Sequence, residues 1–313
     1  MILPSPVLSQ DRKTAWPDGT LIHDRYSILR GLNAAATRLP QVGQVQVFEV
    51  VDLEDDDRPK VLKLLIRQQS TRLDRLYREA EVLMRGPQHP QIPKAAVDGF
   101  FCWRPIDSRW PFQGLVMEAI AGESLEAYLD RQGAIDPLEA IRWWVQLSSL
   151  LHNLHQAGWV HGDVKPANLI RRPQGDLALV DFDAAMAVGD RAAAACGSAG
   201  YIAPEQRERE PVGPASDWFS LGRTIVHWLT GQHPLDLMAQ SVDSDFDWRW
   251  AVPGLPDSIA DAIDILMAPN PSDRRIMPAG TTATSLLPLA QRLARPPVVA
   301  TPPRQFPEFP RAA

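Results

Sequence analysis

Short apolar stretches with strand character lie between residues 25 and 118, and at residues 45–50 apolar and polar residues alternate with the period of two that is typical of strands. The expected strands are 26–29, 45–50, 61–65 and 114–117. Apolar side chains recur instead at helical spacing at Leu73, Leu76, Tyr77, Ala80 and Leu83. This part of the chain is therefore predicted to form a small antiparallel sheet accompanied by one main helix.

Beyond Gly122 the apolar spacing becomes typical of helices. Asp136 is a good N-cap in front of Pro137, and the helix that begins there is expected to end just before Gly158. Its apolar face consists of Ala140, Trp144, Leu147, Leu151 and Leu154. The sequence thus predicts an α+β protein with two lobes, a β-rich N-lobe at 25–118 and a larger, mostly helical C-lobe at 119–290.

Both ends of the chain lack this periodicity. Residues 1–24 are interpreted as an N-terminal extension, and residues 291–313 as a disordered, Pro-rich tail. The prolines of this end of the chain are Pro296, Pro297, Pro302, Pro303, Pro307 and Pro310. A disordered tail is the preferred interpretation of these prolines, and recruitment of a partner domain is the alternative.

Composition excludes several classes of function. The formal net charge is -6, from Lys+Arg 32 and Asp+Glu 38, and a nucleic-acid partner is not expected because such proteins need a concentrated basic surface. Cys102 and Cys196 lie far apart without zinc-ligand spacing, which favours a reducing compartment. We find neither a secretory leader nor an apolar stretch that would span a membrane, and we expect a cytoplasmic protein.

The chemistry is concentrated in two segments. Residues 161–168 read His-Gly-Asp-Val-Lys-Pro-Ala-Asn, and residues 181–183 read Asp-Phe-Asp. Phosphoryl transfer needs a carboxylate that orients the acceptor, metal ligands on the triphosphate and cations against the developing charge. Asp163 suits the first role, and Asn168 and Asp181 suit the second. These two segments therefore predict a site that handles phosphate.

The same segments resemble the HRDLKPxN catalytic loop and the DFG motif of eukaryotic-type Ser/Thr protein kinases. The resemblance covers about residues 25–289, and its details look most like bacterial kinases of the cyanobacterial type. It implies the bilobal kinase fold, ATP with Mg²⁺ (Mn²⁺ being possible) as cofactors, and a protein substrate that the sequence does not identify. It also implies that Lys165 lies against the γ-phosphate.

Further site residues follow from the resemblance. Lys63, in the strand Val-Leu-Lys that begins at Val61, resembles the lysine that holds the α- and β-phosphates, and Glu79 resembles its helix partner. Met117 resembles the gatekeeper at the hinge. The backbone of Glu118 and Ile120 would then face the adenine, and Glu123, or Ser124 beside it, would reach the ribose.

Two segments nearer the C-terminus indicate a protein acceptor. Residues 197–205 resemble the peptide-positioning segment that ends in Ala-Pro-Glu, and 216–222 resemble the helix whose buried acid braces the catalytic loop. Arg274 is the expected partner of Glu205. Small-molecule kinases share the Asp and Asn chemistry but lack this peptide-positioning segment, so the segment favours a protein substrate.

The chain departs from the family pattern at three places. No GxGxxG is present between Leu29 and Phe48, and Gly43 is the one glycine near the expected turn over the phosphates. Gly162 replaces the arginine that receives an activation-loop phosphate, and 184–196 contain no Ser, Thr or Tyr. Asp183 replaces the DFG glycine; it is interpreted mainly as a cap of the following turn, with magnesium binding as the alternative.

These departures leave three functions open. The first is an active Ser/Thr protein kinase that does not require activation-loop phosphorylation. The second is a pseudokinase that serves as a binding module or scaffold, because the glycines are missing and the DFG motif is altered. The third is a small-molecule kinase, because such enzymes also use HGD and DFD sequences.

Overall fold

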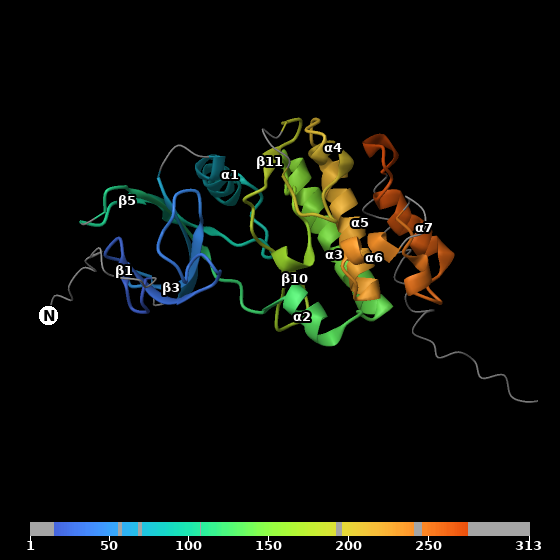
Figure 1. Ribbon diagram of the computed structural model, residues 1–313, viewed down its shortest axis with the longest axis horizontal. Coiled ribbons are helices and arrows are strands. Elements are labelled where there is room, and N and C mark those ends of the chain that lie inside the picture. The colour runs from blue at the N-terminus through green and yellow to red at the C-terminus, as the bar shows by residue number, and fades with distance from the viewer. Residues whose placement is uncertain are drawn as a thin grey trace, which may run out of the picture.

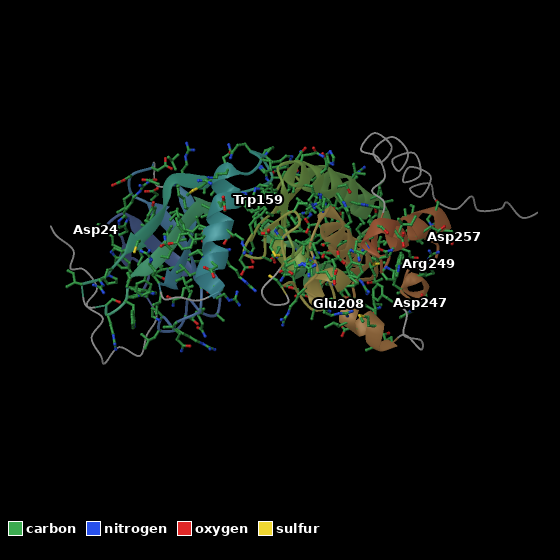
Figure 2. The ribbon with its side chains drawn as sticks, turned by 90° about the horizontal axis from the view of Figure 1, so that it is seen from above. Asp24, Trp159, Glu208, Asp247, Arg249 and Asp257 are labelled. Atoms are coloured by element: carbon green, nitrogen blue, oxygen red, sulfur yellow. The ribbon has the colours of Figure 1, made fainter. Side chains whose placement is uncertain are left out.

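The computed structural model describes residues 16–55, 58–67, 71–106, 108–191, 196–240 and 246–274. Two lobes lie side by side (Figure 1), the first built from a sheet and one long helix and the second mainly from helices. Seen from above, Asp24 lies at the far end of the first lobe and Asp257 at the far end of the second (Figure 2). The predicted α+β, two-lobed architecture is confirmed.

The N-lobe contains a six-stranded antiparallel sheet with the order β1-β2-β3-β4-β6-β5. Its strands are β1 (Leu21–Ile22), β2 (Tyr26–Gly31), β3 (Gln46–Asp52), β4 (Pro59–Ile66), β5 (Ala95–Trp103) and β6 (Phe112–Glu118). Burial alternates along β3 as its sequence predicts, because one face of the strand covers a core. Helix α1 (Thr71–Arg85) packs against β5 and β6.

Residues 16–24, which the sequence placed in an N-terminal extension, are part of this lobe. Trp16 is 7% exposed and packs in a core with Tyr26, Phe48 and Phe112. Its indole Nε1 donates a hydrogen bond to Oε1 of Gln46 over 3.0 Å. A buried indole with a satisfied N–H stabilises the attachment of this segment. Residues 1–15 and the expected tail at 291–313 lie outside the described part of the chain.

The C-lobe is built around two long helices, α3 (Pro137–Gln156) and α5 (Pro214–Thr230). The Asp136 carboxylate caps α3 by accepting bonds from the amides of Leu138 and Glu139. The remaining helices are α2 (Leu125–Gln132), α4 (Pro204–Arg207), α6 (Pro234–Gln240), α7 (Asp257–Leu266), η1 (Pro166–Asn168), η2 (Arg249–Ala251) and η3 (Pro271–Asp273). Within the described ranges, no helix combines the length and apolar character needed to cross a membrane.

Short strands in the C-lobe hold the loops that face the N-lobe. They are β7 (Glu123–Ser124), β8 (Trp159–Val160), β9 (Leu169–Arg171), β10 (Leu177–Leu179) and β11 (Met186–Ala187). β9 pairs with both β10 and β7, and β8 pairs with β11. These pairings fix the two ends of the segments at 161–168 and 181–183 on the rigid helical lobe.

A buried carboxylate, Asp52 at the end of β3, holds two cations of the N-lobe. Arg25 donates to both of its oxygens over 2.6 and 2.8 Å, and Lys60 Nζ donates to Oδ2 over 2.8 Å. Burial alone would raise the pKa of Asp52, but these hydrogen bonds outweigh it and hold the pKa well below its ordinary value. Asp52 is therefore ionised at neutral pH.

We expect Asp52→Asn to lower the free energy of unfolding by about 2 kcal/mol at pH 7, because two largely buried cations lose their shared anion. A depressed carboxyl pKa stabilises the fold above the unfolded pKa of about 4, and that contribution is lost as pH falls through the folded value. The difference from wild type should thus shrink in acid. Urea unfolding at pH 7 and pH 3 measures it, and a difference independent of pH contradicts the assignment.

The matched control for this measurement is Glu49→Gln. Glu49 pairs with Arg30, whose side chain is 67% exposed. Removal of such a solvent-exposed pair should change stability by less than about 1 kcal/mol.

Candidate active site

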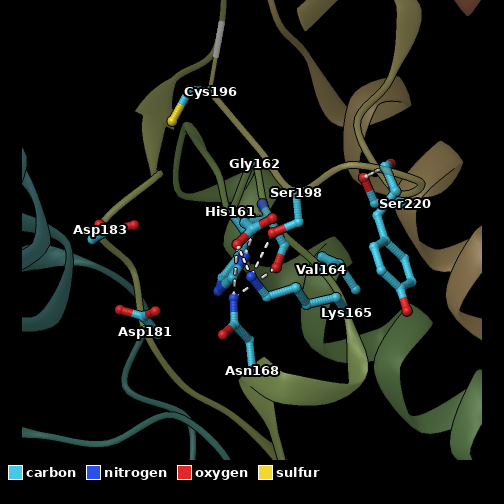
Figure 3. Close-up of polar contacts among 12 residues, drawn as sticks. His161, Gly162, Val164, Lys165, Asn168, Asp181, Asp183, Cys196, Ser198 and Ser220 are labelled. Atoms are coloured by element: carbon cyan, nitrogen blue, oxygen red, sulfur yellow. Dashed lines mark hydrogen bonds and ion pairs between the residues drawn. The ribbon is translucent and has the colours of Figure 1, made fainter. Parts of the chain in front are cut away.

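The segment 161–168 turns between β8 and η1 and presents Asp163, Lys165 and Asn168 to one point. Asn168 Nδ2 donates to the backbone oxygen of Asp163 over 2.9 Å and to its Oδ2 over 3.2 Å. Lys165 Nζ lies 2.7 Å from the same Oδ2 and 2.5 Å from Ser198 Oγ. Figure 3 shows Lys165 and Asn168 turned toward a common centre, with Ser198 on the facing segment.

Asp163 keeps one carboxylate oxygen free. Its side chain is largely buried, and Oδ1 has no hydrogen-bond partner among the described residues. Lys165 and Asn168 fix the other oxygen, Oδ2, so the orientation of the carboxylate is set. A fixed carboxylate whose second oxygen is buried and without a described partner can accept a proton from a hydroxyl that is brought against it.

Asp217 of α5 is hydrogen-bonded to the backbone of this loop. Its carboxylate accepts bonds from the amides of His161 and Gly162, each over 2.8 Å, and contacts His155 Nε2 over 2.8 Å. Burial opposes its ionisation, but the bond and charge of His155 outweigh burial and lower the pKa of Asp217. The loop that carries Asp163 is therefore anchored on α5, a largely buried helix of the C-lobe.

A buried ion pair connects β4 with α1. Lys63 Nζ lies 2.6 and 2.7 Å from the two carboxylate oxygens of Glu79, and 2.5 Å from Asp181 Oδ1. Burial pulls the pKa of Lys63 down, but the two acids outweigh burial and hold it above its ordinary value. Burial raises the pKa of Glu79, and the contact with Lys63 opposes this rise. Lys63 thus remains a cation beside the candidate metal ligand Asp181.

Glu79 also links α1 to the segment after β10. The amide of Phe182 donates to Glu79 Oε1 over 3.1 Å. The Phe182 ring lies edge-on to His161 with 4.8 Å between ring centroids, and Leu83 belongs to the same buried core. Helix α1, the segment 181–183 and the catalytic loop are therefore joined by packed side chains as well as by the ion pair of Lys63 with Glu79.

Asn168 and Asp181 have the oxygen chemistry that Mg²⁺ prefers. Among the described residues no group of three or more His, Cys, Asp or Glu side chains could hold a metal by themselves. Mg²⁺ commonly needs only one or two protein oxygens when phosphates supply others. The two side chains fit that arrangement, since the Asn168 amide donates through Nδ2 and leaves its oxygen available.

A cavity of about 330 Å³ lies between the loop after β2, helix α1 and Asp181. Of the residues predicted for the nucleotide, Lys63, Glu79 and Gly43 line it together with Asp181. Gly43 has φ +78°, a left-handed conformation that favours glycine. These residues, predicted to lie near the phosphates of the nucleotide, therefore line the same cavity.

The loop over this cavity is fastened by side chains instead of a glycine-rich turn. Asn33 Oδ1 accepts bonds from the amides of Ala36 and Val47, and Nδ2 donates to the Val45 oxygen. Gln46 Nε2 donates to two further carbonyl oxygens of the loop. The side-chain amide of Asn33 is therefore committed to the loop itself.

The residues predicted for adenine and ribose do not line this cavity. Val61 and Met117 are opposite each other in the pairing of β4 with β6, so they lie at one end of the sheet. Glu118 ends β6, where its amide donates to the Lys94 oxygen, and Ile120 follows in the connection to the C-lobe. Their contact with a nucleotide base therefore stays a prediction.

Glu123 and Ser124 have partners within the C-lobe. Glu123 pairs with Arg131 over 2.7 Å, and Ser124 Oγ accepts the Ala127 amide as the N-cap of α2. A ribose contact by Glu123 also stays a prediction, one that would compete with this exposed ion pair.

Asp183 is held from the N-lobe. Arg72 Nη1 donates to its Oδ2 over 3.1 Å, and Arg75 lies 4.0 Å from the same oxygen. The sequence indicated Asp183 as a cap of the following turn, whereas its partners come from α1. Burial and the neighbouring Asp181 raise the pKa of Asp183. Sequence patterns missed both arginines, because 111 residues separate Arg72 from its partner.

Glu205 and Arg274 form a second buried pair. Two guanidinium nitrogens of Arg274 bond to the two Glu205 oxygens over 2.6 and 2.9 Å, and Ser216 Oγ donates to Glu205 over 2.7 Å. The Arg274 side chain is fully buried. This pair fastens the end of the segment 197–205 to the helical lobe.

Comparisons with known proteins agree with this arrangement. The family model described as "Protein kinase domain" matches residues 41–278. Serine/threonine-protein kinase F of Synechocystis is 35% identical over 214 residues, which are 63% of this chain and 41% of that protein. The Mycobacterium tuberculosis kinases PknK and PknL are each 33% identical, over 64% and 61% of this chain and 19% and 50% of their own lengths. The chain thus spans half or less of these relatives.

Proposed function

The chain belongs to the protein kinase domain family, and on that premise we propose that it transfers the γ-phosphate of ATP to a Ser or Thr hydroxyl of a protein. The observation that carries this proposal is the convergence of Asp163, Lys165 and Asn168 on one point facing Asp181. The similar proteins named Ser/Thr kinases support the acceptor class. The family's use of ATP with Mg²⁺ supports the cofactors.

In the proposed reaction the acceptor hydroxyl oxygen bonds to the γ-phosphorus while the bond to the β,γ-bridging oxygen breaks. Asp163 Oδ1, which has no partner within the described part of the chain, takes the hydroxyl proton. Lys165 and Lys63 oppose the negative charge of the transferring group and of the diphosphate that leaves. Mg²⁺, held by Asn168 and Asp181, would supply further neutralisation of phosphate charge.

A protein acceptor agrees with the segment 197–205. Ser198 contacts Lys165 of the catalytic loop, and Glu205 is fixed by Arg274, so the segment is attached to the helical lobe at both ends. Such attachment provides a surface along which a peptide can lie beside Asp163. A small-molecule acceptor would not need this segment.

We further propose that activity does not require phosphorylation of the activation loop. Residues 184–196 contain no Ser, Thr or Tyr, and Gly162 replaces the receiving arginine. Phosphatase-treated enzyme should therefore turn over at the rate of untreated enzyme. Phosphate found in this segment together with a rise in turnover contradicts the proposal.

The first experiment incubates purified protein with labelled ATP, Mg²⁺ or Mn²⁺ and a generic basic protein. Transfer to Ser or Thr is expected, and Lys63→Met should reduce it about 100-fold or more because one of the cations on the phosphates is lost. ATP binding is measured in parallel by calorimetry.

The pseudokinase is the second candidate, favoured by the single glycine and by the commitment of Asn33 to its own loop. Bound ATP without transfer in wild type identifies this candidate. Phosphate on a metabolite instead of on protein identifies a small-molecule kinase.

A further inference from the structure

Gln206 of α4 joins the catalytic loop to the segment that follows Asp183. Its Nε2 donates to the Gly162 oxygen over 2.8 Å and to the Cys196 oxygen over 3.1 Å. Gly162 immediately precedes Asp163, and Cys196 lies two residues before Ser198. Figure 3 shows Gly162 and Cys196 on the two segments that this amide connects.

The nitrogen and the oxygen of the Gln206 side-chain amide are both hydrogen-bonded within the protein. The residue is 1% exposed, both Nε2 hydrogens are used, and Oε1 accepts the Ala203 amide over 3.1 Å. A buried amide with every group satisfied fixes the geometry of its partners, because a shift of any one leaves a buried polar group unpaired.

The backbone at Gly162 is shaped for this contact. Gly162 has φ +77°, and a Cβ atom there would lie 2.7 Å from the Ala184 oxygen. A Cβ at Gly197 would lie 3.3 Å from the Gly162 oxygen. The two segments therefore approach closely at a pair of glycines, and an arginine at position 162 would be excluded both by conformation and by space.

We infer that Gln206 is the positioning residue that holds Asp163 and Ser198 in register through neutral hydrogen bonds. In this chain those bonds take the place of the contact that an arginine before the catalytic Asp makes with an activation-loop phosphate in regulated kinases. The inference rests on the proposed kinase activity, but it concerns how the two segments are held. It predicts that Asp163 and Ser198 are held in their catalytic arrangement without phosphorylation of the activation loop.

The charged groups around Gln206 are already paired. Glu205 beside it in α4 is bound by Arg274, and Asp217 of α5, which bonds to the Gly162 amide, is bound by His155. Both are ionised carboxylates that only accept hydrogen bonds, so neither can replace the amide as a donor. Loss of the Gln206 donors should therefore leave two carbonyl oxygens unpaired.

The decisive variant is Gln206→Glu. A carboxylate has the size of the amide but cannot donate, so at pH 8 kcat should fall about 100-fold, the effect of two lost bonds near the reacting groups. The KM for ATP should stay within about twofold of wild type, since Lys63, Glu79 and Asp181 are untouched.

A pH series separates positioning from general damage. Burial against two carbonyl oxygens raises the pKa of the introduced carboxyl, and its protonated form can donate one of the two bonds. The ratio of variant to wild-type kcat should therefore rise as pH falls from 8 to 6. Gln206→Leu, which cannot donate at any pH, should show a constant ratio.

Gln113→Glu is the matched control. Gln113 is 3% exposed and donates to the Phe101 oxygen over 2.7 Å, but it lies in β6 of the N-lobe. This variant should lose stability while its folded fraction keeps the wild-type kcat. A Gln206→Glu enzyme with wild-type kcat at pH 8, or a ratio that does not change with pH, overturns the inference.

Amide hydrogen exchange gives a readout that does not depend on turnover. Residues 196–204 should exchange at least about tenfold faster in Gln206→Leu than in wild type, because the bond to the Cys196 oxygen is gone. If wild type transfers no phosphate, the proposed function fails, whereas this exchange measurement still decides whether Gln206 holds the two segments. Unchanged exchange overturns the inference.

Discussion

Asp163→Asn is expected to reduce phosphoryl transfer about 1,000-fold while ATP binding and folding remain close to wild type. Asparagine has the shape of aspartate and can keep its carbonyl oxygen at the position of Oδ2, where Lys165 and Asn168 donate. The amide nitrogen then occupies the position of Oδ1, which has no partner among the described residues. An amide there cannot accept the proton of the acceptor hydroxyl.

Single-turnover transfer of labelled phosphate measures the effect, with ATP affinity measured by calorimetry. Asp176→Asn is the matched control, because Asp176 is a carboxylate in the same lobe that pairs with Arg172 away from the catalytic loop. Its transfer rate should stay within about twofold of wild type, because the partners of Asp176, Arg172 and Gln91, lie outside the catalytic loop. An Asp163→Asn enzyme that retains a tenth of the wild-type rate would remove Asp163 from the proposed role.

Arg274→Met is expected to lower the free energy of unfolding by about 3–5 kcal/mol, the cost of leaving a buried charge without its partner. Arg274 also donates to the oxygens of Ala215, Ala268 and Pro269, so its loss frees a set of buried acceptors. Methionine fills much of the same volume. The destabilisation should therefore arise from polar groups and charge more than from a cavity.

The effect of Arg274→Met should depend on pH. Burial opposes ionisation of Glu205, but hydrogen bonds from Arg274 and Ser216 outweigh burial and lower its pKa. A lowered pKa contributes stability above the unfolded value of about 4.3 that is lost as the pH falls through the folded value. Denaturant unfolding at pH 7 should show the full loss, and at pH 3 a smaller one.

A double variant tests the origin of this loss. Glu205→Gln combined with Arg274→Met should cost less than Arg274→Met alone, because no unpaired carboxylate remains. A double variant that is as unstable as the sum of the single variants would show that the two residues act independently.

Contiguous segments made much of this molecule predictable. The Asp136 cap and the glycine after Ala157 mark both ends of α3, and the expected strands 26–29, 45–50, 61–65 and 114–117 lie at nearly the observed bounds of β2, β3, β4 and β6. The strand β5 was missed, and its pairing with β6 shifts register between Ala95 and Phe100. A bulged strand lacks the period of two on which the prediction depends.

Contacts that join distant residues were the part that sequence patterns could not supply. Asn33, Arg72 and Gln206 are common polar residue types without a characteristic spacing, and their roles depend on which backbone oxygens or carboxylates the fold brings near them. Lys63 and Glu79, in contrast, were recognisable only through a family resemblance. The residues that hold the catalytic groups in place are therefore harder to find than the catalytic groups themselves.

The loop fastened by Asn33 and Gln46 has a thermodynamic consequence. A glycine-rich turn is free to sample many conformations, and a ligand that orders it bears the entropy of that ordering. Here five side-chain hydrogen bonds already restrict the backbone on either side of Gly43. Nucleotide binding to this chain should therefore carry a smaller entropic penalty from the loop, and the loop has correspondingly less freedom to adapt to ligands of different shape.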